Sequence, residues 1–532
     1  MPLNRQSDTQ PAFLQDGEVV TSPGFKEAFS QFSQAGWQSL QHSAELGGQD
    51  LSKLVGAIFQ ENMNAGSAAF ALGTLLTDSV IETLAEAASA EQKAQYLPAM
   101  LEGRWMGTMN LTESQAGSDL SQVKCLATPQ ADGSYQLQGE KIFISYGDHD
   151  LAENIIHLVL ARTPDAPAGI KGLSLFIVPK YLVQDHGESS AGARNAVHCA
   201  SLEHKLGLHG SPTAVMLYEG AVGYLVGELH RGLEYMFITM NAARYAIAIQ
   251  ALGVADRALY SAQRYAVERK QGVDLMRKLE APVAIAEHPD VMRMLQTMRG
   301  LTEATRAVSY QAAWSKDMAL KHSEPAQRAH YQAQYEFYVP IVKGFATEMV
   351  NEVASLGIQV HGGMGYIEET GVAQYLRDSR VFSIYEGTTA IQANDLIGRK
   401  LLRDQGAVAL SIAAEIEATV AALAAQPAPA LQHIAERLQQ ACEAYKVSIE
   451  ALLAFNQQQN PQAVYLGSVP FLLLAGVLLG GWQMAKAALV CADATDEFSQ
   501  QKLKTAQFYA AHLLPRAAMH ASAICDGTKL CG

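Results

Sequence analysis

The spacing of apolar residues changes its character twice along this 532-residue chain, and these changes limit the possible folds more than any single motif. From about Phe25 to Gly103, apolar residues recur at three- and four-residue intervals, as on the buried face of a helix. From Thr108 to about Glu228, β-branched and alternating runs are separated by Gly and Asp turns, which is typical of strands. Helical spacing returns after Gly232. The sequence therefore predicts a mainly α protein with a central β domain.

A second break in the pattern divides the C-terminal half. The stretch Gln-Pro-Ala-Pro at 426–429 interrupts the helical spacing, and three helical segments follow near 430–457, 463–490 and 497–523. We therefore expect four domains. They are an N-terminal helical domain (residues 1–107), a middle β domain (108–228), a C-terminal helical bundle (229–405) and an additional helical domain (406–532).

One segment of the last domain is apolar enough to raise the question of a membrane. No charged residue lies between Ala463 and Ala485, a length that could cross a bilayer, and Gly476 and Gly480 form a small-xxx-small pair. However, several Gly, Ser and Pro residues lower the mean hydropathy, and no positive cluster flanks either end. We therefore expect a buried helix of a soluble bundle, and a membrane span is the alternative.

Charge and cysteine content exclude several classes of function. The formal net charge of −14 disfavours nucleic acid, whose phosphates require a basic surface, but it is compatible with a nucleotide cofactor held by backbone N–H groups. The six cysteines are scattered, without a CxxC pair or metal-ligand spacing. Residues 1–23 lack the apolar region of a secretion signal and are not arginine-rich. We expect a cytoplasmic protein with neither a disulfide framework nor a structural metal.

The first segment that is a candidate for ligand binding or catalysis is 109–119, Met-Asn-Leu-Thr-Glu-Ser-Gln-Ala-Gly-Ser-Asp. Small and hydroxyl-bearing residues on a loop can bring N–H and O–H donors close to a heterocycle or a phosphate. A loop between a helix and a strand, with a capping residue and no ligand, would have the same composition.

The second segment, 139–147, reads Gly-Glu-Lys-Ile-Phe-Ile-Ser-Tyr-Gly. Strand alternation places Phe143 and Ser145 on one face. A flat aromatic ring beside a hydroxyl suits packing against, and hydrogen bonding to, a planar heterocycle. The ordinary alternative is a half-buried strand.

Two arginines lie on the long helix that follows. Arg244 sits among Ala and Ile, where an unpaired guanidinium is costly, so it should meet a carboxylate or a ligand. Arg269 lies near the helix end, where a solvated cation also complements the helix dipole.

The third and fourth segments stand close together. Residues 359–366, Gln-Val-His-Gly-Gly-Met-Gly-Tyr, contain adjacent glycines that permit close backbone approach to a phosphate. Residues 384–392, Ile-Tyr-Glu-Gly-Thr-Thr-Ala-Ile-Gln, place one carboxylate, Glu386, among small and apolar residues. A carboxylate in such surroundings has a raised pKa and becomes a usable base near neutral pH. We interpret His361 as a packing or substrate-proximal residue, because no partner with metal-binding spacing accompanies it.

In this order and at this spacing, the four segments resemble the acyl-CoA dehydrogenases over about residues 25–405, and the extra C-terminal part resembles that of the larger bacterial members. The resemblance implies an N-terminal helical domain, a middle β-barrel domain and a C-terminal helical bundle, with FAD as cofactor. It implies that Glu386 and Arg244 are catalytic and that Ser118, Tyr385 and Gly387 bind substrate. The implied cofactor contacts are Met109, Leu111, Thr112, Gly117, Ser118, Phe143, Ser145, Arg269, Gln359, Gly362, Gly363 and Thr388.

Several of these contacts have particular roles in the family pattern. Leu111 and Thr112 face the pyrimidine edge of the flavin, and Ser145 donates toward its hydride-accepting N5 side. Arg269, Gln359 and Gly363 would contact the FAD of a neighbouring subunit, which implies a homo-oligomer, either a dimer or a tetramer.

The sequence departs from the family pattern at some positions. Ser114 stands where proline is common, Phe143 replaces tryptophan, and Ser145 replaces threonine. The phenylalanine that usually follows Arg269 is missing, which puts its contact to the adenine half in doubt. The larger members usually begin earlier, so the first helices of the N-terminal domain are expected to be absent. Residues beyond Gly406 carry no assignable motif.

The reaction implied by the resemblance is α,β-dehydrogenation of an acyl-CoA thioester to a trans-2-enoyl-CoA, as in fatty acid β-oxidation. Glu386 would remove the α proton, and FAD would accept the hydride and pass electrons to an electron-transferring flavoprotein. One alternative is an acyl-CoA oxidase that uses O2. Another is a non-enzymatic flavin-binding relative that binds DNA through a basic C-terminal domain, but residues 401–532 hold eight Lys and Arg against ten Asp and Glu.

Overall fold

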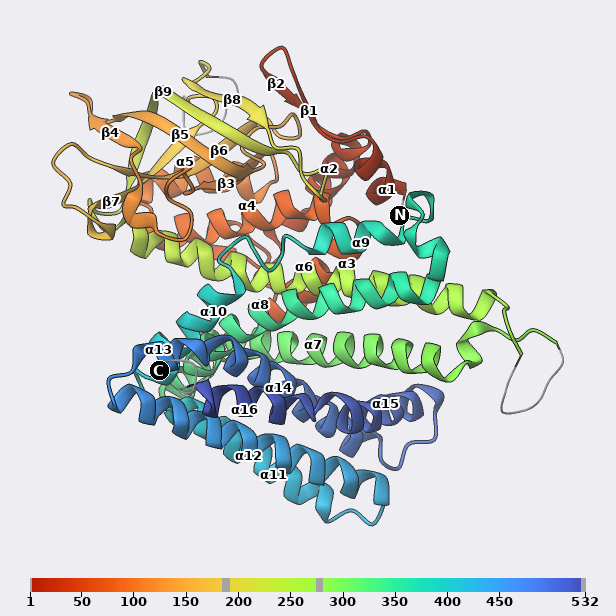
Figure 1. Ribbon diagram of the computed structural model, residues 1–532. Coiled ribbons are helices and arrows are strands. Elements are labelled where there is room, and N and C mark those ends of the chain that lie inside the picture. Colours follow the sequence, from red (N-terminus) through yellow and green to blue (C-terminus); the bar gives the residue numbers. More distant parts are fainter. Residues whose placement is uncertain (1, 184–191, 274–280, 528–532) are drawn as a thin grey trace. The chain divides into compact units, whose positions relative to one another are not determined.

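The structure, a computed structural model, describes residues 2–183, 192–273 and 281–527 (Figure 1). The chain forms two compact units, Met1–Ala246 and Ile247–Gly532. The long helix α6, Gly232–Glu268, runs through the boundary between them. Each unit has its own apolar core, and each is described by itself below.

The first unit begins with helices whose ends are set by serine caps. Ser67 accepts a hydrogen bond from the Phe70 N–H at the start of α4, and Ser89 forms a capping box with Gln92 at the start of α5. Helix α4 is buried along most of its length and packs on strand β3. The polar N-terminus, for which the sequence predicted no element, forms a helix and a hairpin. The elements are α1 Pro2–Thr9, β1 Phe13–Gln15, β2 Glu18–Val20, α2 Phe25–Gln34, α3 Lys53–Gly66, α4 Ala68–Ala87 and α5 Ala90–Leu101.

The middle of the first unit is a closed β-barrel. Strand β6 pairs with β7, β7 with β9, β9 with β5, β5 with β4, and β4 with β6 again, which closes the ring. Strand β3 extends the sheet in parallel beside β6, and β8 pairs with β9. The predicted β-barrel is confirmed. The strands are β3 Trp105–Asn110, β4 Leu126–Pro129, β5 Tyr135–Ser145, β6 Asn154–Arg162, β7 Leu173–Pro179, β8 Val197–Leu202 and β9 Thr213–Val226.

The second unit consists of helices and connecting loops and has no strand among the residues that the structure describes. Helices α7 and α8 pack against each other along their length, and α14 packs on both of them. The α-helices are α7 Pro289–Lys321, α8 Pro325–His361, α9 Val372–Ser379, α10 Thr389–Asp395, α11 Ala407–Ala424, α12 Pro429–Gln457, α13 Pro461–Leu466, α14 Ser468–Cys491, α15 Glu497–Phe508 and α16 Arg516–Cys525. The unit also contains the 3₁₀ turns η6 Ile285–Glu287, η7 Gly362–Tyr366 and η8 Glu368–Thr370 and the π-helical turns η9 Leu396–Leu401 and η10 Tyr509–Leu513. The predicted mainly helical fold with an added C-terminal helical region is confirmed.

Most of the uncharged run is buried, as predicted, although Tyr465 and Leu466 are exposed, and the run is not one helix. Gly467 separates α13 from α14, and α14 ends at Cys491, close to the end of the segment predicted near 463–490. Gly476 and Gly480 are points of close approach: a Cβ at Gly476 would lie 2.3 Å from the Phe345 ring, and one at Gly480 would lie 2.6 Å from the Tyr509 hydroxyl. The small residues therefore let neighbouring parts of the bundle approach α14.

By length and composition alone, α4, α11 and α14 could each cross a membrane. Of the most apolar window, 83% is buried in α4 and 78% in α14, so the apolar residues of these two helices belong to the interior of their own units. In α11 only 28% is buried. Its exposed positions are mostly alanine, which raises hydropathy without forming a large apolar surface.

We expect Leu474→Asp to destabilise the second unit by at least about 3 kcal/mol, because it removes a fully buried leucine and buries an unpaired carboxylate. Val490→Asp is the matched control on the same helix, since Val490 is 85% exposed. Limited proteolysis and sedimentation without detergent measure the effect. Recovery of the wild-type chain only from membranes would contradict the buried role.

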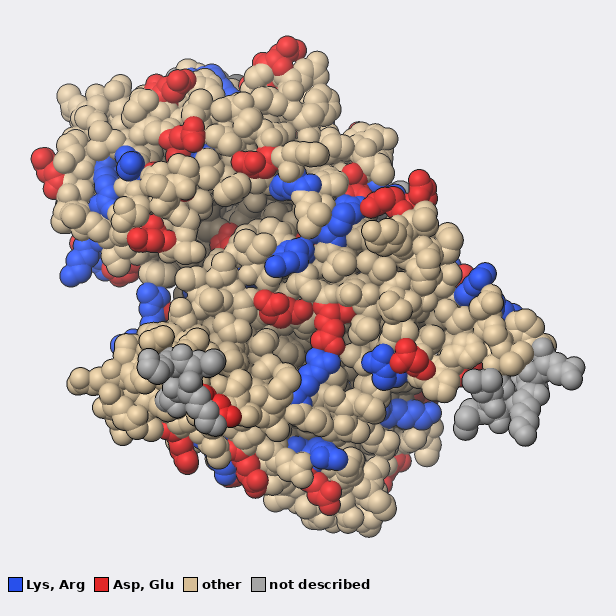
Figure 2. All heavy atoms as spheres, in the orientation of Figure 1, with Lys and Arg blue, Asp and Glu red and all other residues tan. Residues whose placement is uncertain are grey.

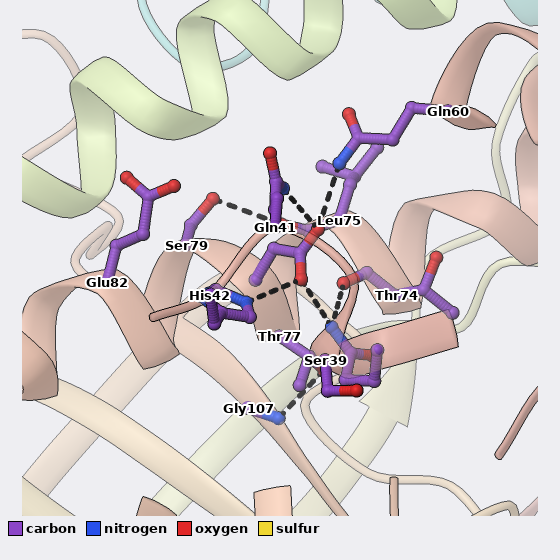
Figure 3. A network of polar contacts seen from close by, with 12 residues as sticks. Ser39, Gln41, His42, Gln60, Thr74, Leu75, Thr77, Ser79, Glu82 and Gly107 are labelled. Atoms are coloured by element: carbon purple, nitrogen blue, oxygen red, sulfur yellow. Dashed lines mark hydrogen bonds and ion pairs between the residues drawn. The ribbon is translucent and has the colours of Figure 1, made fainter. Parts of the chain in front are cut away.

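A polar cluster joins the helices of the first unit. Asp78 on α4 accepts hydrogen bonds from Gln38 (2.5 Å), Gln41 (3.0 Å) and Gln60 (2.9 Å), and its Oδ1 lies 3.0 Å from His42 Nε2. Figure 3 shows Gln41 and His42, which are adjacent in the chain, and Gln60 of α3 converging from two segments. One helix position thereby fixes α3 and the preceding turns to α4.

Asp78→Asn should lower the free energy of unfolding of the first unit by about 1–3 kcal/mol. The amide N–H groups of asparagine would face donors at a position where the carboxylate accepts hydrogen bonds. The measurement is urea unfolding followed by circular dichroism, with Glu86→Gln as the exposed control on the same helix. Equal midpoints for the two variants would show that the cluster contributes nothing measurable.

On the face drawn in Figure 2, basic and acidic side chains are interspersed among uncharged ones on each unit. The coloured atoms of this face form no broad basic patch, in keeping with the net charge of −14.

Candidate active site

The segment 109–119 leaves strand β3 and forms a loop with exposed small residues. Met109 is buried in the strand, Leu111 and Thr112 are half-buried, and Gly117 and Ser118 are exposed. A Cβ at Gly117 would meet no atom within 4 Å. The backbone at this end of the loop is therefore open to close approach by a ligand.

A buried ion pair joins this loop to the second segment. Lys141 Nζ on β5 lies 2.8 Å from Glu113 Oε1 and donates to the Leu111 carbonyl at 3.0 Å. Glu113 also accepts hydrogen bonds from the backbone N–H groups of Lys124 and Cys125. Burial opposes ionisation of Glu113, but Lys141 and the two N–H groups outweigh it, and its pKa lies below the usual value. The Glu113–Lys141 pair therefore fixes the position of residues 111–113.

Phe143 has an unusual backbone conformation. Strand β5 has a bulge between Lys141 and Ile144, and Phe143 within it has φ of 59°. Ile144 is buried, Phe143 is 59% exposed, and Ser145 is half-buried, so Phe143 and Ser145 lie away from the core. The bulge turns an aromatic ring outward beside a hydroxyl.

The two arginines of α6 differ in environment. Arg244 is buried, and its Nη1 lies 3.4 Å from the amide oxygen of Asn241. Arg269 follows the helix end, is exposed, and donates to Gln271 Oε1 at 3.2 Å. Because Arg269 is exposed, its side chain can contact another molecule. The side chain of Arg244 is buried within its own unit.

The Gly-rich segment follows directly after α8. Gln359, Gly362 and Gly363 are exposed, and a Cβ at either glycine would meet nothing within 4 Å. His361 is buried, stacks on Tyr265 with ring centroids 4.4 Å apart, and places Nδ1 2.7 Å from the Gly357 carbonyl. His361 therefore packs the helix end, and burial lowers its pKa.

Glu386 lies on residues 380–388, here called the base loop, which join α9 to α10. Glu386 is half-buried and has φ of 52°, in the left-handed region that non-glycine residues rarely adopt. The Tyr385 hydroxyl donates to Gln250 Oε1 on α6, and Gly387 has φ of 86°. Thr388 caps α10, with its hydroxyl accepting from the Ile391 N–H at 3.4 Å. The base loop is thus anchored at several points around the glutamate.

Some residues that organise the site were not singled out from the sequence. These are the Glu113–Lys141 pair, Gln250, and two donors to the base loop, Lys343 and Gln392. Polar residues in otherwise apolar helices are the available signal, since Gln250, Lys343 and Gln392 are fully buried.

Each unit, taken by itself, offers groups that suit part of a nucleotide cofactor. In the first unit, Phe143 and Ser145 offer a ring and a hydroxyl, and Gly117 offers open backbone. In the second unit, Gly362 and Gly363 offer open backbone. Within the described parts of the chain, no group of three or more His, Cys, Asp or Glu is arranged to hold a metal.

Four family models match successive parts of the chain. The N-terminal, middle and C-terminal domains of acyl-CoA dehydrogenase match residues 15–104, 108–220 and 230–402, and the model described as acetyl-CoA dehydrogenase C-terminal like matches 412–531.

Characterised relatives align along nearly the whole chain. The 3-methylmercaptopropionyl-CoA dehydrogenase of Ruegeria pomeroyi is 51% identical over 530 residues, covering 99% of this chain and 89% of the relative. A broad-specificity linear acyl-CoA dehydrogenase of Mycobacterium tuberculosis is 34% identical over 528 residues, covering 93% and 84%.

Solved structures share the fold. An acyl-CoA dehydrogenase from Bacillus anthracis, complexed with FAD, has a TM-score of 0.77 at 22% identity and covers 94% of this chain and 82% of its own. The butyryl-CoA dehydrogenase of Megasphaera elsdenii has a TM-score of 0.61 at 25% identity, covering 75% and 93%. The chain belongs to the acyl-CoA dehydrogenase family of FAD-dependent oxidoreductases, in the form that carries an extra C-terminal helical domain.

Proposed function

We propose that this protein oxidises an acyl-CoA thioester to the trans-2-enoyl-CoA, with Glu386 as the base that removes the α proton. The observation that carries the proposal is the placement of Glu386, a half-buried carboxylate in a left-handed conformation between a half-buried tyrosine and a glycine. Non-glycine residues held in such conformations concentrate at functional sites.

In the proposed reaction, the Glu386 carboxylate takes the proton from the α carbon, and the electron pair of that broken C–H bond forms the π bond of the new C=C. The β carbon loses a hydride, which carries away the electron pair of its own C–H bond. Bound FAD supplies the two-electron acceptor for that hydride. The backbone N–H of Glu386 donates to the thioester carbonyl and stabilises the developing enolate charge. Arg244, which is buried on α6, is the second catalytic residue of the proposal. Ser118, Tyr385 and Gly387 bind the substrate.

For the cofactor, we propose that Met109, Leu111, Thr112, Gly117, Ser118, Phe143 and Ser145 hold the flavin and its pyrophosphate. Arg269, Gln359, Gly362, Gly363 and Thr388 contact the cofactor from the other side or from a neighbouring subunit. The exposed glycines and the outward Phe143 support this assignment.

The acyl group we propose is a short, sulfur-containing one, 3-methylmercaptopropionyl. Its support is the relative of that name, which is 51% identical over 99% of this chain. The physiological acceptor we propose is an electron-transferring flavoprotein, and the compartment is the cytoplasm.

Anaerobic titration of the flavoprotein with a panel of acyl-CoA thioesters tests the reaction and the substrate together. We expect bleaching of the flavin absorbance to be fastest with 3-methylmercaptopropionyl-CoA and slower with butyryl-CoA and longer linear chains. Absence of bleaching with every thioester would refute the proposed reaction, whereas faster bleaching by a linear chain would refute only the substrate. Rapid reoxidation of the reduced flavin by air would favour the oxidase alternative.

A shared cofactor predicts that flavin retention depends on assembly. We expect at least a dimer, and dilution should release FAD and lower thermal stability together, because bound partner and cofactor stabilise only the assembled state. Sedimentation velocity with detection at the flavin absorbance measures this. A fully flavinated monomer would contradict it.

A further inference from the structure

Two buried side chains hold the backbone on both sides of Glu386. Lys343 on α8 is fully buried, and its Nζ donates to the Phe382 carbonyl at 2.9 Å and to the Gly387 carbonyl at 2.6 Å. Gln392 on α10 is also fully buried, and its Nε2 donates to the Glu386 and Gly387 carbonyls, each at 3.1 Å. The Gly387 carbonyl thus accepts from both.

These contacts enter the base loop from two different helices. Lys343 joins its start and its end, because Phe382 precedes Glu386 and Gly387 follows it. Gln392 fixes the peptide planes on the C-terminal side of Glu386. With Lys343 holding the Phe382 carbonyl before Glu386 and Gln392 holding the Glu386 carbonyl, the backbone is held on both sides of Glu386, and this backbone determines where the glutamate side chain and its N–H point.

The conformation needs such support. A non-glycine residue in the left-handed region costs about 1–3 kcal/mol and persists only where its surroundings hold it. Glu386 and Gly387 both have positive φ, at 52° and 86°. Burying a lysine amine is costly as well, so a lysine at this position requires acceptors such as the two loop carbonyls.

We propose that Lys343 and Gln392 are positioning residues, which hold the base loop so that the Glu386 carboxylate and its N–H keep the geometry needed for α-proton removal. This inference rests on the proposed function, because it assigns these residues a role only if Glu386 is the base. Neither residue is proposed to touch the substrate.

The test uses Lys343→Met and Gln392→Met in the full-length flavoprotein, since methionine keeps length and burial but removes the donors. Lys400→Met is the control in the same unit, because Lys400 pairs with Glu336 at the surface, away from the base loop. Stopped-flow flavin reduction is measured against substrate concentration and pH.

We expect the limiting rate to fall on the order of tenfold to a hundredfold in both variants, because a shift of about 1 Å in a reacting group can have such an effect. The KM for the thioester and the flavin spectrum should stay close to those of wild type. Lys343→Met should also move the acid limb of the pH profile to higher pH, since it removes a cationic side chain beside the loop, whereas Gln392→Met should not.

The failures are distinguishable. If wild type is reduced by substrate and Glu386→Gln is inert, yet both methionine variants reduce at the wild-type rate, the positioning role is overturned. A second outcome would also overturn the inference. In it, the reduction rate of each methionine variant falls only in proportion to the FAD that it has lost, and both pH profiles are unchanged. The two residues would then contribute to folding alone. If no thioester reduces wild type, the proposed function itself fails.

Discussion

Glu386→Gln should leave FAD bound and acyl-CoA affinity near that of wild type, yet lower the rate of flavin reduction by several orders of magnitude. The amide keeps the size and half-buried position of the side chain but cannot take up the α proton. A loss confined to the chemical step is the expected kinetic signature of removing a proton acceptor. Anaerobic stopped-flow reduction at saturating thioester measures it.

Glu369→Gln is the matched control, because Glu369 is an exposed carboxylate of the same unit. It should reduce at the wild-type rate. If Glu386→Gln still bleaches at a tenth of the wild-type rate, another group is the base.

Glu113→Gln should destabilise the first unit by about 3–5 kcal/mol, because it leaves the ammonium of Lys141 buried without its anionic partner. Flavin affinity should fall with it, since the pair fixes the backbone of residues 111–113. Urea unfolding followed by circular dichroism and by flavin release measures both effects.

The double variant Glu113→Gln with Lys141→Met should recover most of the lost stability, because no unpaired charge then remains in the interior. Glu140→Gln, at an exposed position on the same strand, is the control. Equal stability of wild type and both Glu113 variants would show that the pair does not stabilise the unit.

The same pair gives a pH dependence with a defined sign. The pKa of Glu113 is below its ordinary value of 4.5 in the folded unit, so its contribution is fully present above that value. It is lost as the pH falls from about 4.5 through the lowered folded pKa. Glu113→Gln should therefore flatten the loss of stability in this acidic window.

The periodicity of apolar residues alone predicted the order of helices, β domain and helices. A change from helical to strand spacing affects many residues of a segment at once, so it is easy to detect. The burial of α14 was predictable for the same reason, since its apolar residues are not confined to one face. The break at Gly467 was not, because one glycine in an apolar run is compatible with a continuous helix.

The local geometry of the candidate site was less accessible from the sequence. A positive φ at Phe143 or Glu386 leaves no periodic signal, because tertiary contacts impose it on residues that ordinarily avoid it. Lys343 lies 44 positions before Gly387 in the chain, and Lys141 lies 28 after Glu113, so neither pair is visible as a local motif. The sequence motif predicts Glu386 as the base, and only the fold reveals the side chains that contact its loop.

The close approach of α14 to α8 limits how this protein can have been assembled in evolution. A Cβ at Gly344, the residue after Lys343, would lie 2.6 Å from the Leu472 side chain of α14. Arg516 on α16 forms a two-pronged ion pair with Glu352 on α8 at 2.8 and 2.7 Å. The C-terminal helices are therefore not interchangeable with those of a relative. A recombination event near Gly406 would combine α8 with C-terminal helices whose side chains do not match its packing surface and charges. We therefore expect the two regions to be inherited together.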